Sequence, residues 1–182
     1  MAPVTMAQPA VANDVAPGRL AFPFSVRPLL ALWNALHLEP GPRAAESSKP
    51  ALWQRGEFLV NGPGHCGECH SPRNVLGATT GVALSGAVMP VTNWVAPSLR
   101  DSTAAGVNDA NHAATARLLK TGWARHGQAS GPMAEVVKGG TQYLTDEDLQ
   151  AMLTYLAEPR TLDELNAQAL PLIDEMAEAL AK

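Results

Sequence analysis

The chain has few charges, few aromatic side chains and only two cysteines among its 182 residues. Charged residues make up 16% of the sequence and the formal net charge is -4, so the basic surface that binds nucleic acid is not expected. No apolar run is long enough to cross a membrane as a helix. The first twenty residues lack the basic start and the continuous apolar stretch of a secretory signal peptide. Glycine and proline, by contrast, number fifteen each, which predicts much irregular structure.

Both cysteines stand in one short motif, Cys66-Gly67-Glu68-Cys69-His70. The pattern C-x-x-C-H is the signal for covalent attachment of a c-type haem. The two thiols add to the vinyl groups of the porphyrin, and the adjacent histidine then lies under the iron as a proximal ligand. A zinc site would need further cysteine or histidine ligands, and a thioredoxin-like pair would need a βαβ pattern nearby. The chain has no further cysteine and shows no such pattern, so the motif predicts one covalent haem c.

The chain is predicted to have three parts, and a turn-rich stretch at 39–50 marks the first boundary between them. Residues 1–49 are expected to form a linker and a packing helix, which Ser25 can cap and Trp33 anchors on the domain. Residues 50–157 are expected to form the haem domain. Residues 158–182 are expected to form an amphipathic helical tail that packs on its own domain or on a partner subunit.

Three helices are predicted within the haem domain. The first covers 51–60 and contains Gly56, which costs about 1 kcal/mol relative to alanine in a helix interior. A second helix that crosses closely at this point would explain the glycine, because the absent Cβ lets two backbones approach. The next predicted helix is closed by Gly122. After a predicted loop at 123–132, the last helix begins at Thr145 with a pattern resembling a capping box.

Methionine is the usual second axial ligand of a six-coordinate haem in cytochromes c. Of the six methionines, two lie in the N-terminal linker and two stand among leucines at helical spacing, where they are expected to fill the core. Met133 follows Ser130-Gly131-Pro132 in a predicted loop that can hold its side chain over the haem face. Met133 is therefore the preferred distal ligand and Met89 is the alternative. A histidine ligand and an open distal site are the remaining possibilities.

These features together resemble class I c-type cytochromes. They are especially similar to the haem domains in multihaem cytochrome c subunits of membrane-associated alcohol, gluconate and sorbitol-type dehydrogenases. The resemblance covers roughly residues 50–157. The segments that carry it are RGEFLV at 55–60, GHCGECHSPRNVLG at 64–77, GPMAEVV at 131–137, LTDEDL at 144–149 and Tyr155-Leu156.

The resemblance implies an all-α, class I cytochrome c fold, in which N- and C-terminal helices cross and loops wrap one covalent haem. The helix at 51–60 is then expected to cross the helix at 146–157 at Gly56, near Tyr155.

The resemblance also implies roles for individual residues. Cys66 and Cys69 would attach the haem, with His70 as proximal and Met133 as distal ligand. The carbonyl of Pro97 would accept a hydrogen bond from His70 Nδ1, which fixes the orientation of the ring. Arg73 and Trp94 are candidates for hydrogen bonds to the haem propionates. The alternatives are that Arg73 is a surface charge and that Trp94 is a packing aromatic.

The function that the resemblance implies is one-electron transfer by Fe(III)/Fe(II) cycling, without independent catalysis. Electrons would come from a dehydrogenase subunit that carries PQQ, flavin or molybdopterin, and would pass to a quinone, another haem or an oxidase. The alternative is a haem enzyme or gas sensor with an open distal site, such as a peroxidase-like protein. A docking module that keeps haem only for folding is a third hypothesis.

Residues 22–36 resemble the connector between successive haem domains in such subunits. This resemblance predicts that the chain is a single-haem part of a longer exported protein, which would account for the missing leader. Covalent haem attachment generally takes place outside the cytoplasm, so we expect a periplasmic location or one at the outer face of the inner membrane. Any association with a membrane would be peripheral and through the larger parent protein.

Overall fold

The computed structural model of the chain describes residues 22–23, 25–38, 46–89, 92–101, 104–108, 110–125 and 127–158, with Pro9 and Gly41. Two compact units divide between Pro42 and Arg43, and each is described by itself. The predicted N-terminal linker falls mostly outside the described residues, and so does the predicted tail after Glu158. No helix of the described residues is long and apolar enough to cross a membrane.

The first unit contains one described helix, α1 (Arg27–His37), which buries none of its side chains. Its residue at the N-cap is Val26, in extended conformation, and no side chain caps the helix. The prediction that Ser25 caps this helix is therefore wrong, because the helix begins one residue too late for its hydroxyl to take that place. The ring of Trp33 lies 5.2 Å from that of His37, centroid to centroid. Its predicted role as an anchor stays a prediction.

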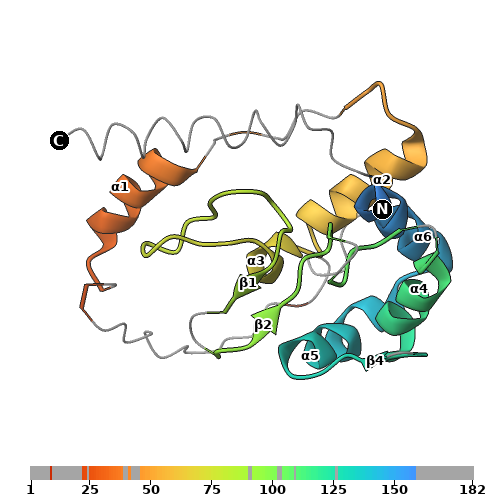
Figure 1. Cartoon of the computed structure of the whole chain (residues 1–182). Helices are drawn as coiled ribbons and strands as arrows, with labels where there is room; N and C mark the ends of the chain where they lie inside the picture. Colours follow the sequence, from red (N-terminus) through yellow and green to blue (C-terminus); the bar gives the residue numbers. More distant parts are fainter. Residues whose placement is uncertain are drawn as a thin grey trace, which may run out of the picture. The chain divides into compact units, whose positions relative to one another are not determined.

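The second unit is predominantly helical (Figure 1). Its helices are α2 (Ala51–Asn61), α3 (Gly67–His70), α4 (His112–Thr121), α5 (Pro132–Gly139) and α6 (Asp146–Ala157), with a 3-10 helix η2 (Thr141–Tyr143). Two short antiparallel pairs complete the described elements: β1 (Ala87–Val88) with β2 (Val95–Ala96), and β3 (Trp123–Ala124) with β4 (Gly127–Gln128).

Helices α2 and α6 lie side by side (Figure 1) and cross at Gly56. A Cβ built on Gly56 would lie 1.9 Å from the carbonyl oxygen of Ala151 and 2.9 Å from Cβ of Tyr155. No other residue can occupy this position without moving one of the two backbones. The prediction of a close crossing at Gly56 is confirmed.

The core gathers around this crossing. Trp53 of α2 and Tyr155 of α6 meet edge to face, with ring centroids 5.1 Å apart, an arrangement that aromatic pairs prefer. Met152 is only 3% exposed, so its prediction as a core residue is confirmed. The buried core cluster consists of Trp53, Leu59, Val60, Leu84, Val107, Leu119, Leu149, Met152, Leu153, Tyr155 and Leu156.

Polar contacts fix the C-terminal end of α6. The carboxylate of Glu158 accepts a hydrogen bond from Trp53 Nε1 at 2.6 Å and pairs with Lys49. Arg100 Nη1 donates to the carbonyl oxygens of Tyr155 at 2.9 Å and Leu156 at 3.1 Å. A guanidinium at this end also complements the negative end of the helix dipole. The loop that carries Arg100 is therefore tied to α6.

The N-terminal end of α6 is capped as predicted. The hydroxyl of Thr145 accepts a hydrogen bond from the backbone N–H of Asp148 at 3.1 Å. The carboxylate of Asp148 in turn accepts from Arg55 Nε at 2.8 Å and Nη2 at 3.1 Å. This two-bonded ion pair adds a second link between α2 and α6.

Two other expectations have different outcomes. Gly122 ends α4 in the left-handed conformation, with φ of 79°, as predicted for a helix C-terminus. The stretch predicted as loop at 123–132 instead contains the β3–β4 hairpin, and α5 begins at Pro132. The hairpin strands have two residues each, too few to give an alternating pattern in the sequence.

The crossing predicts that Gly56→Ala is strongly destabilising. We expect a loss of about 1–3 kcal/mol or more in the free energy of unfolding, because the new Cβ overpacks against the Ala151 backbone. Gly139→Ala is the matched control, since nothing lies within 4 Å of a Cβ built there, and it is expected to change stability by less than about 1 kcal/mol. Denaturant unfolding followed by circular dichroism measures both; equal effects would contradict the close crossing.

The Asp148–Arg55 pair predicts a pH-dependent contribution to stability. The hydrogen bonds that the Asp148 carboxylate accepts from Arg55 hold the pKa of Asp148 below the ordinary value of 3.8. Such a group stabilises the folded state above its unfolded pKa and loses this effect as the pH falls through its lower folded pKa. Asp148→Asn should therefore lower stability slightly at neutral pH, and the difference from the parent protein should vanish on acidification below 3.8. A difference that grows on acidification would contradict this assignment.

Candidate haem-binding site

The C-x-x-C-H motif occupies a single helical turn that follows α2 after a short connection and is tied to its last turn by hydrogen bonds. The backbone N–H of Gly64 donates to Leu59 O at 2.8 Å, and that of Cys66 donates to Val60 O at 3.0 Å. The N–H of His70 then donates to Cys66 O at 3.0 Å, which closes the turn of α3. The packed end of α2 thus fixes where both thiols and the imidazole lie.

Both thiols are free and half-buried. Cys66 packs against the hydrophobic core, and this burial raises the pKa of its thiol to about 11. A reactive C-x-x-C redox pair needs the opposite, a thiol whose pKa is lowered so that the thiolate is populated. Within the described residues, no three His, Cys, Asp or Glu side chains form a group that could hold a metal ion. The surroundings of Cys66 suit a neutral thioether better than a redox-active thiolate.

The imidazole of His70 is held by one backbone carbonyl. Its Nδ1 lies 2.7 Å from the carbonyl oxygen of Pro97, the hydrogen bond that was expected. When Nδ1 donates, Nε2 carries the lone pair and is left for a metal ion. Burial lowers the pKa of His70, against an opposing contribution from the Pro97 carbonyl. The neutral form, which is the one that binds metals, is therefore favoured.

The loop after His70 folds back onto the motif through contacts that the sequence did not reveal. The backbone N–H of Gly86 donates to His70 O at 2.7 Å. The buried hydroxyl of Ser71 accepts from the N–H of Leu84 at 2.9 Å. Leu84 and Gly86 stand in an irregular stretch that carries no sequence signal for these contacts. For Ser71, the one signal was the presence of a polar residue directly after the motif.

The structure places Met133 in the first turn of α5, where it is half-buried and packs against the core. The prediction that Met133 lies in a loop is therefore wrong. Pro132 lies in the first turn of α5, where a backbone N–H has no partner within the helix, so its missing N–H costs nothing. Gly131 is the N-cap residue and has a φ of 53°. The Gly-Pro pair starts a helix instead of pinning a loop.

Met89 lies elsewhere, directly after β1. It lines a small cavity with residues of α3, of the loop after it and of β1: Glu68, Cys69, Ser71, Arg73, Ala87 and Val88. Its neighbour Pro90 is outside the described residues. Met89 therefore stays the alternative ligand.

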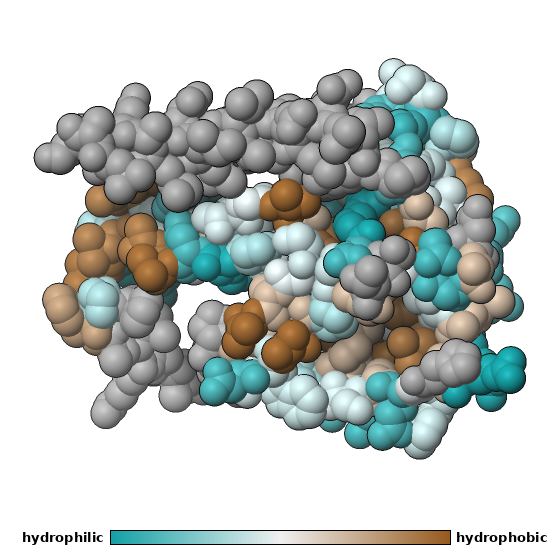
Figure 2. Space-filling model, in the orientation of Figure 1, coloured by the Kyte–Doolittle hydropathy of each residue, from teal (hydrophilic) through white to brown (hydrophobic). Residues whose placement is uncertain are grey.

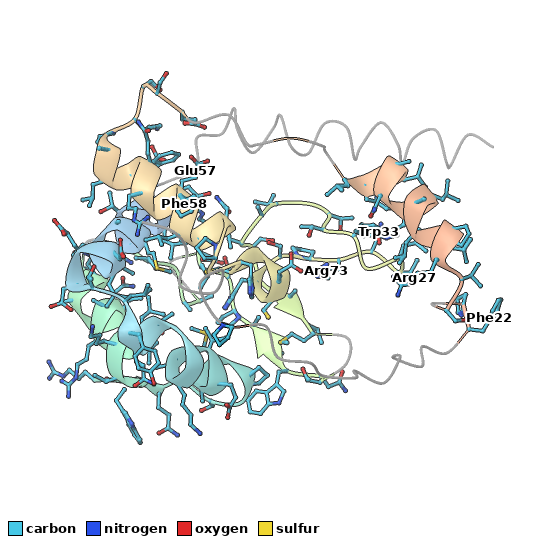
Figure 3. All side chains as sticks on the ribbon, turned by 180° about the vertical axis from the view of Figure 1, so that it is seen from behind. Phe22, Arg27, Trp33, Glu57, Phe58 and Arg73 are labelled. Atoms are coloured by element: carbon cyan, nitrogen blue, oxygen red, sulfur yellow. The ribbon has the colours of Figure 1, made fainter. Side chains whose placement is uncertain are left out.

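The two propionate candidates are in different surroundings. Arg73 lies beside α3 (Figure 3), where its guanidinium pairs with the Glu68 carboxylate and donates to the carbonyl oxygens of Glu68 and Gly77. Trp94 is 47% exposed, and its indole ring lies against Gly131. Their contacts with haem propionates stay predictions.

The donor set and its surroundings fit a covalently bound haem c. Two unbridged thiols and an oriented imidazole share one helical turn, and a half-buried thioether lies at the start of α5. The residues that would hold the group are Cys66, Cys69, His70 and Met133, the set predicted from the sequence.

Comparison with known proteins shows sequence similarity to cytochromes c over most of the chain. Residues 54–158 match the cytochrome c family. The fructose dehydrogenase cytochrome subunit of Gluconobacter japonicus is 39% identical over 140 residues, which are 76% of this chain and 28% of that protein. The alcohol dehydrogenase (quinone) cytochrome c subunit of Gluconobacter oxydans is 36% identical over 156 residues, 82% of this chain and 32% of that protein. The gluconate 2-dehydrogenase cytochrome c subunit of Pantoea cypripedii is 31% identical over 173 residues, 90% and 38% respectively.

The chain thus spans between 28% and 38% of the length of these relatives. The match confirms the resemblance and the predicted class I cytochrome c fold. It also implies covalently bound haem c. With its C-x-x-C-H turn at the end of α2 and its crossing of α2 and α6, this chain belongs to the cytochrome c family.

Proposed function

We propose that this chain is the single-haem, one-electron relay part of a dehydrogenase complex. Cys66 and Cys69 attach the haem, His70 is its proximal ligand and Met133 its distal ligand. The bound iron supplies the chemistry by taking up and releasing one electron at a time. The observation that carries the proposal is the 2.7 Å contact between His70 Nδ1 and Pro97 O, because it presents Nε2 from the same turn as both thiols.

The protein contributes by holding its ligands still. His70 is fixed through both its ring and its backbone carbonyl, which accepts from Gly86. Met133 is fixed through the core contacts of its side chain and the first turn of α5. If His70 and Met133 both held the iron, the soft thioether would favour its reduced form and no position would be left for a substrate. Small rearrangement on electron uptake suits a carrier.

The electron donor would be a dehydrogenase subunit and the acceptor a quinone, another haem or an oxidase. A dehydrogenase as donor is supported by the names of the relatives, which are cytochrome subunits of fructose and alcohol dehydrogenases. Cytochrome c subunits of bacterial dehydrogenases are typically extracytoplasmic, which supports a location in the periplasm or at the outer face of the inner membrane.

Apolar side chains near the motif could serve brief docking of such partners. Val88 of β1 and Val95 of β2 are 61% and 69% exposed, and Figure 2 shows hydrophobic side chains on this face of the hairpin. Val88 also borders the cavity that contains Cys69. A small surface of this kind suits the weak, transient contacts of electron-transfer proteins.

A six-coordinate relay predicts slow or undetectable binding of external ligands. The haem-loaded chain should show the weak far-red charge-transfer band of Met–Fe(III) bonding when oxidised, and should not bind CO rapidly when reduced. Absorption spectroscopy and flow mixing with CO measure both. Rapid CO binding to the unmodified protein would instead favour an enzyme or gas sensor with an open distal site.

The ligand assignment predicts different outcomes at the two methionines. Met133→Ala should abolish the far-red band and open the haem to CO, because the distal ligand is removed. Met89→Ala is the matched control and should retain the band. Loss of the band in Met89→Ala alone would transfer the distal role to Met89.

A further inference from the structure

One short segment, Trp94 to Pro97, reaches the surroundings of both proposed axial ligands. It contains strand β2, whose residues Val95 and Ala96 pair with Val88 and Ala87. The pairing continues beyond the strand, since the N–H of Met89 donates to Trp94 O at 2.9 Å. Extended backbone rises about 3.3 Å per residue, so Trp94 and Pro97 are held roughly 10 Å apart.

The C-terminal end of this segment is packed onto the proximal histidine. Pro97 O lies 2.7 Å from His70 Nδ1. Gly86 packs against both His70 and this segment. Its N–H donates to His70 O, and a Cβ on Gly86 would lie 2.7 Å from Ser98 N and 3.0 Å from Ala96 O. The φ of Gly86 is +89°, a conformation that also favours glycine. Pro97 therefore has little freedom to move relative to His70.

The N-terminal end of the segment is packed just before the distal methionine. A Cβ built on Gly131 would lie 2.6 Å from both Cε2 and Cζ2 of Trp94, and 2.8 Å from Cδ2. The indole ring thus occupies the place where any other residue would carry its side chain. Gly131 is the N-cap residue of α5, two positions before Met133, and its φ of +53° is itself suited to glycine.

We propose that the segment Trp94–Pro97 sets the positions of both axial ligands, with Trp94 as a positioning residue for Met133 acting through Gly131. This inference rests on the proposed haem ligation by His70 and Met133. The indole is a rigid plate that seats the start of α5, while the paired strand connects this seat to the carbonyl that orients His70. The two ligands come from distant parts of the chain, and this segment gives them a common reference.

The role proposed for Trp94 is distinct from hydrogen bonding to a propionate. The ring atoms that face Gly131 are carbons of the indole. Seating by the ring depends on its size and flatness, whereas a propionate bond depends on the indole N–H alone. Trp94→Phe keeps a flat ring and removes the N–H, so the two roles give different results.

The principal experiment compares Trp94→Leu with Trp123→Leu in the haem-loaded full chain. Trp123 is an exposed tryptophan on β3, 63% accessible, and serves as the matched control. We expect Trp94→Leu to weaken the far-red band and to raise the affinity of the oxidised protein for imidazole about tenfold, which corresponds to about 1.4 kcal/mol of lost Met133 positioning. Trp123→Leu should change neither. Parental imidazole affinity and an intact band in Trp94→Leu would overturn the proposal.

Trp94→Phe provides a second test that does not depend on the folding of the leucine variant. Imidazole affinity close to that of the parent supports seating by the ring. A tenfold increase in Trp94→Phe, equal to that in Trp94→Leu, would show that a flat ring at this position does not seat the start of α5, and would overturn the proposal.

A double-mutant cycle with Gly131→Ala tests the contact itself. The backbone strain of alanine at φ of +53° is present with either residue at 94, but the clash with the indole is present only with tryptophan. We expect Gly131→Ala to raise imidazole affinity less in the Trp94→Leu background than in the parent, and additive effects would count against the contact.

Met133→Ala distinguishes failure of the proposed ligation from failure of the positioning role. If it leaves the far-red band intact, the proposed ligation fails; if it removes the band while the Trp94 variants behave like the parent, only the positioning role fails.

Discussion

The close crossing of α2 and α6 at Gly56 is the contact on which the rest of the haem domain depends. It brings two backbones so close that no Cβ fits between them, and it buries Trp53, Met152 and Tyr155 around the contact. The attachment motif follows within a few residues of α2 and is bonded to its last turn. The position of the haem-binding turn is therefore inherited from the helix crossing, and both ends of α6 are fixed by polar contacts with other segments.

The segment from Trp94 to Arg100 joins this core to the site. Arg100 binds the carbonyl groups at the end of α6, and its guanidinium lies 4.8 Å from the ring centroid of Tyr155. Three residues earlier, Pro97 orients His70. The segment thus has few degrees of freedom left, which suits the proposed role of a carrier whose ligands should move little between two oxidation states.

The elements that the sequence predicted well are those whose signals are local. Helix α2, the end of α4 at Gly122 and the capped start of α6 follow from periodicity, a left-handed glycine and a threonine before an acidic turn. The errors also have local causes. The Gly131-Pro132 pair suits the start of a helix as well as a loop, and the choice depends on Trp94, which is 37 positions away from Gly131 by sequence number. The β3–β4 hairpin was missed because it is too short for a period to show.

The sequence by itself determined the chemistry of attachment, because two thiols and an imidazole within five residues need no distant partner to be placed on one turn. It also indicated the glycine at the helix crossing, since a helix-interior glycine has a cost that calls for a reason. The family resemblance named the Pro97 carbonyl as the partner of His70 Nδ1, but only the tertiary structure decided which ring seats the start of α5 and which loop closes on the motif. These contacts join residues far apart in the chain, and they depend on how the loops return across the packed helices, which no local pattern specifies.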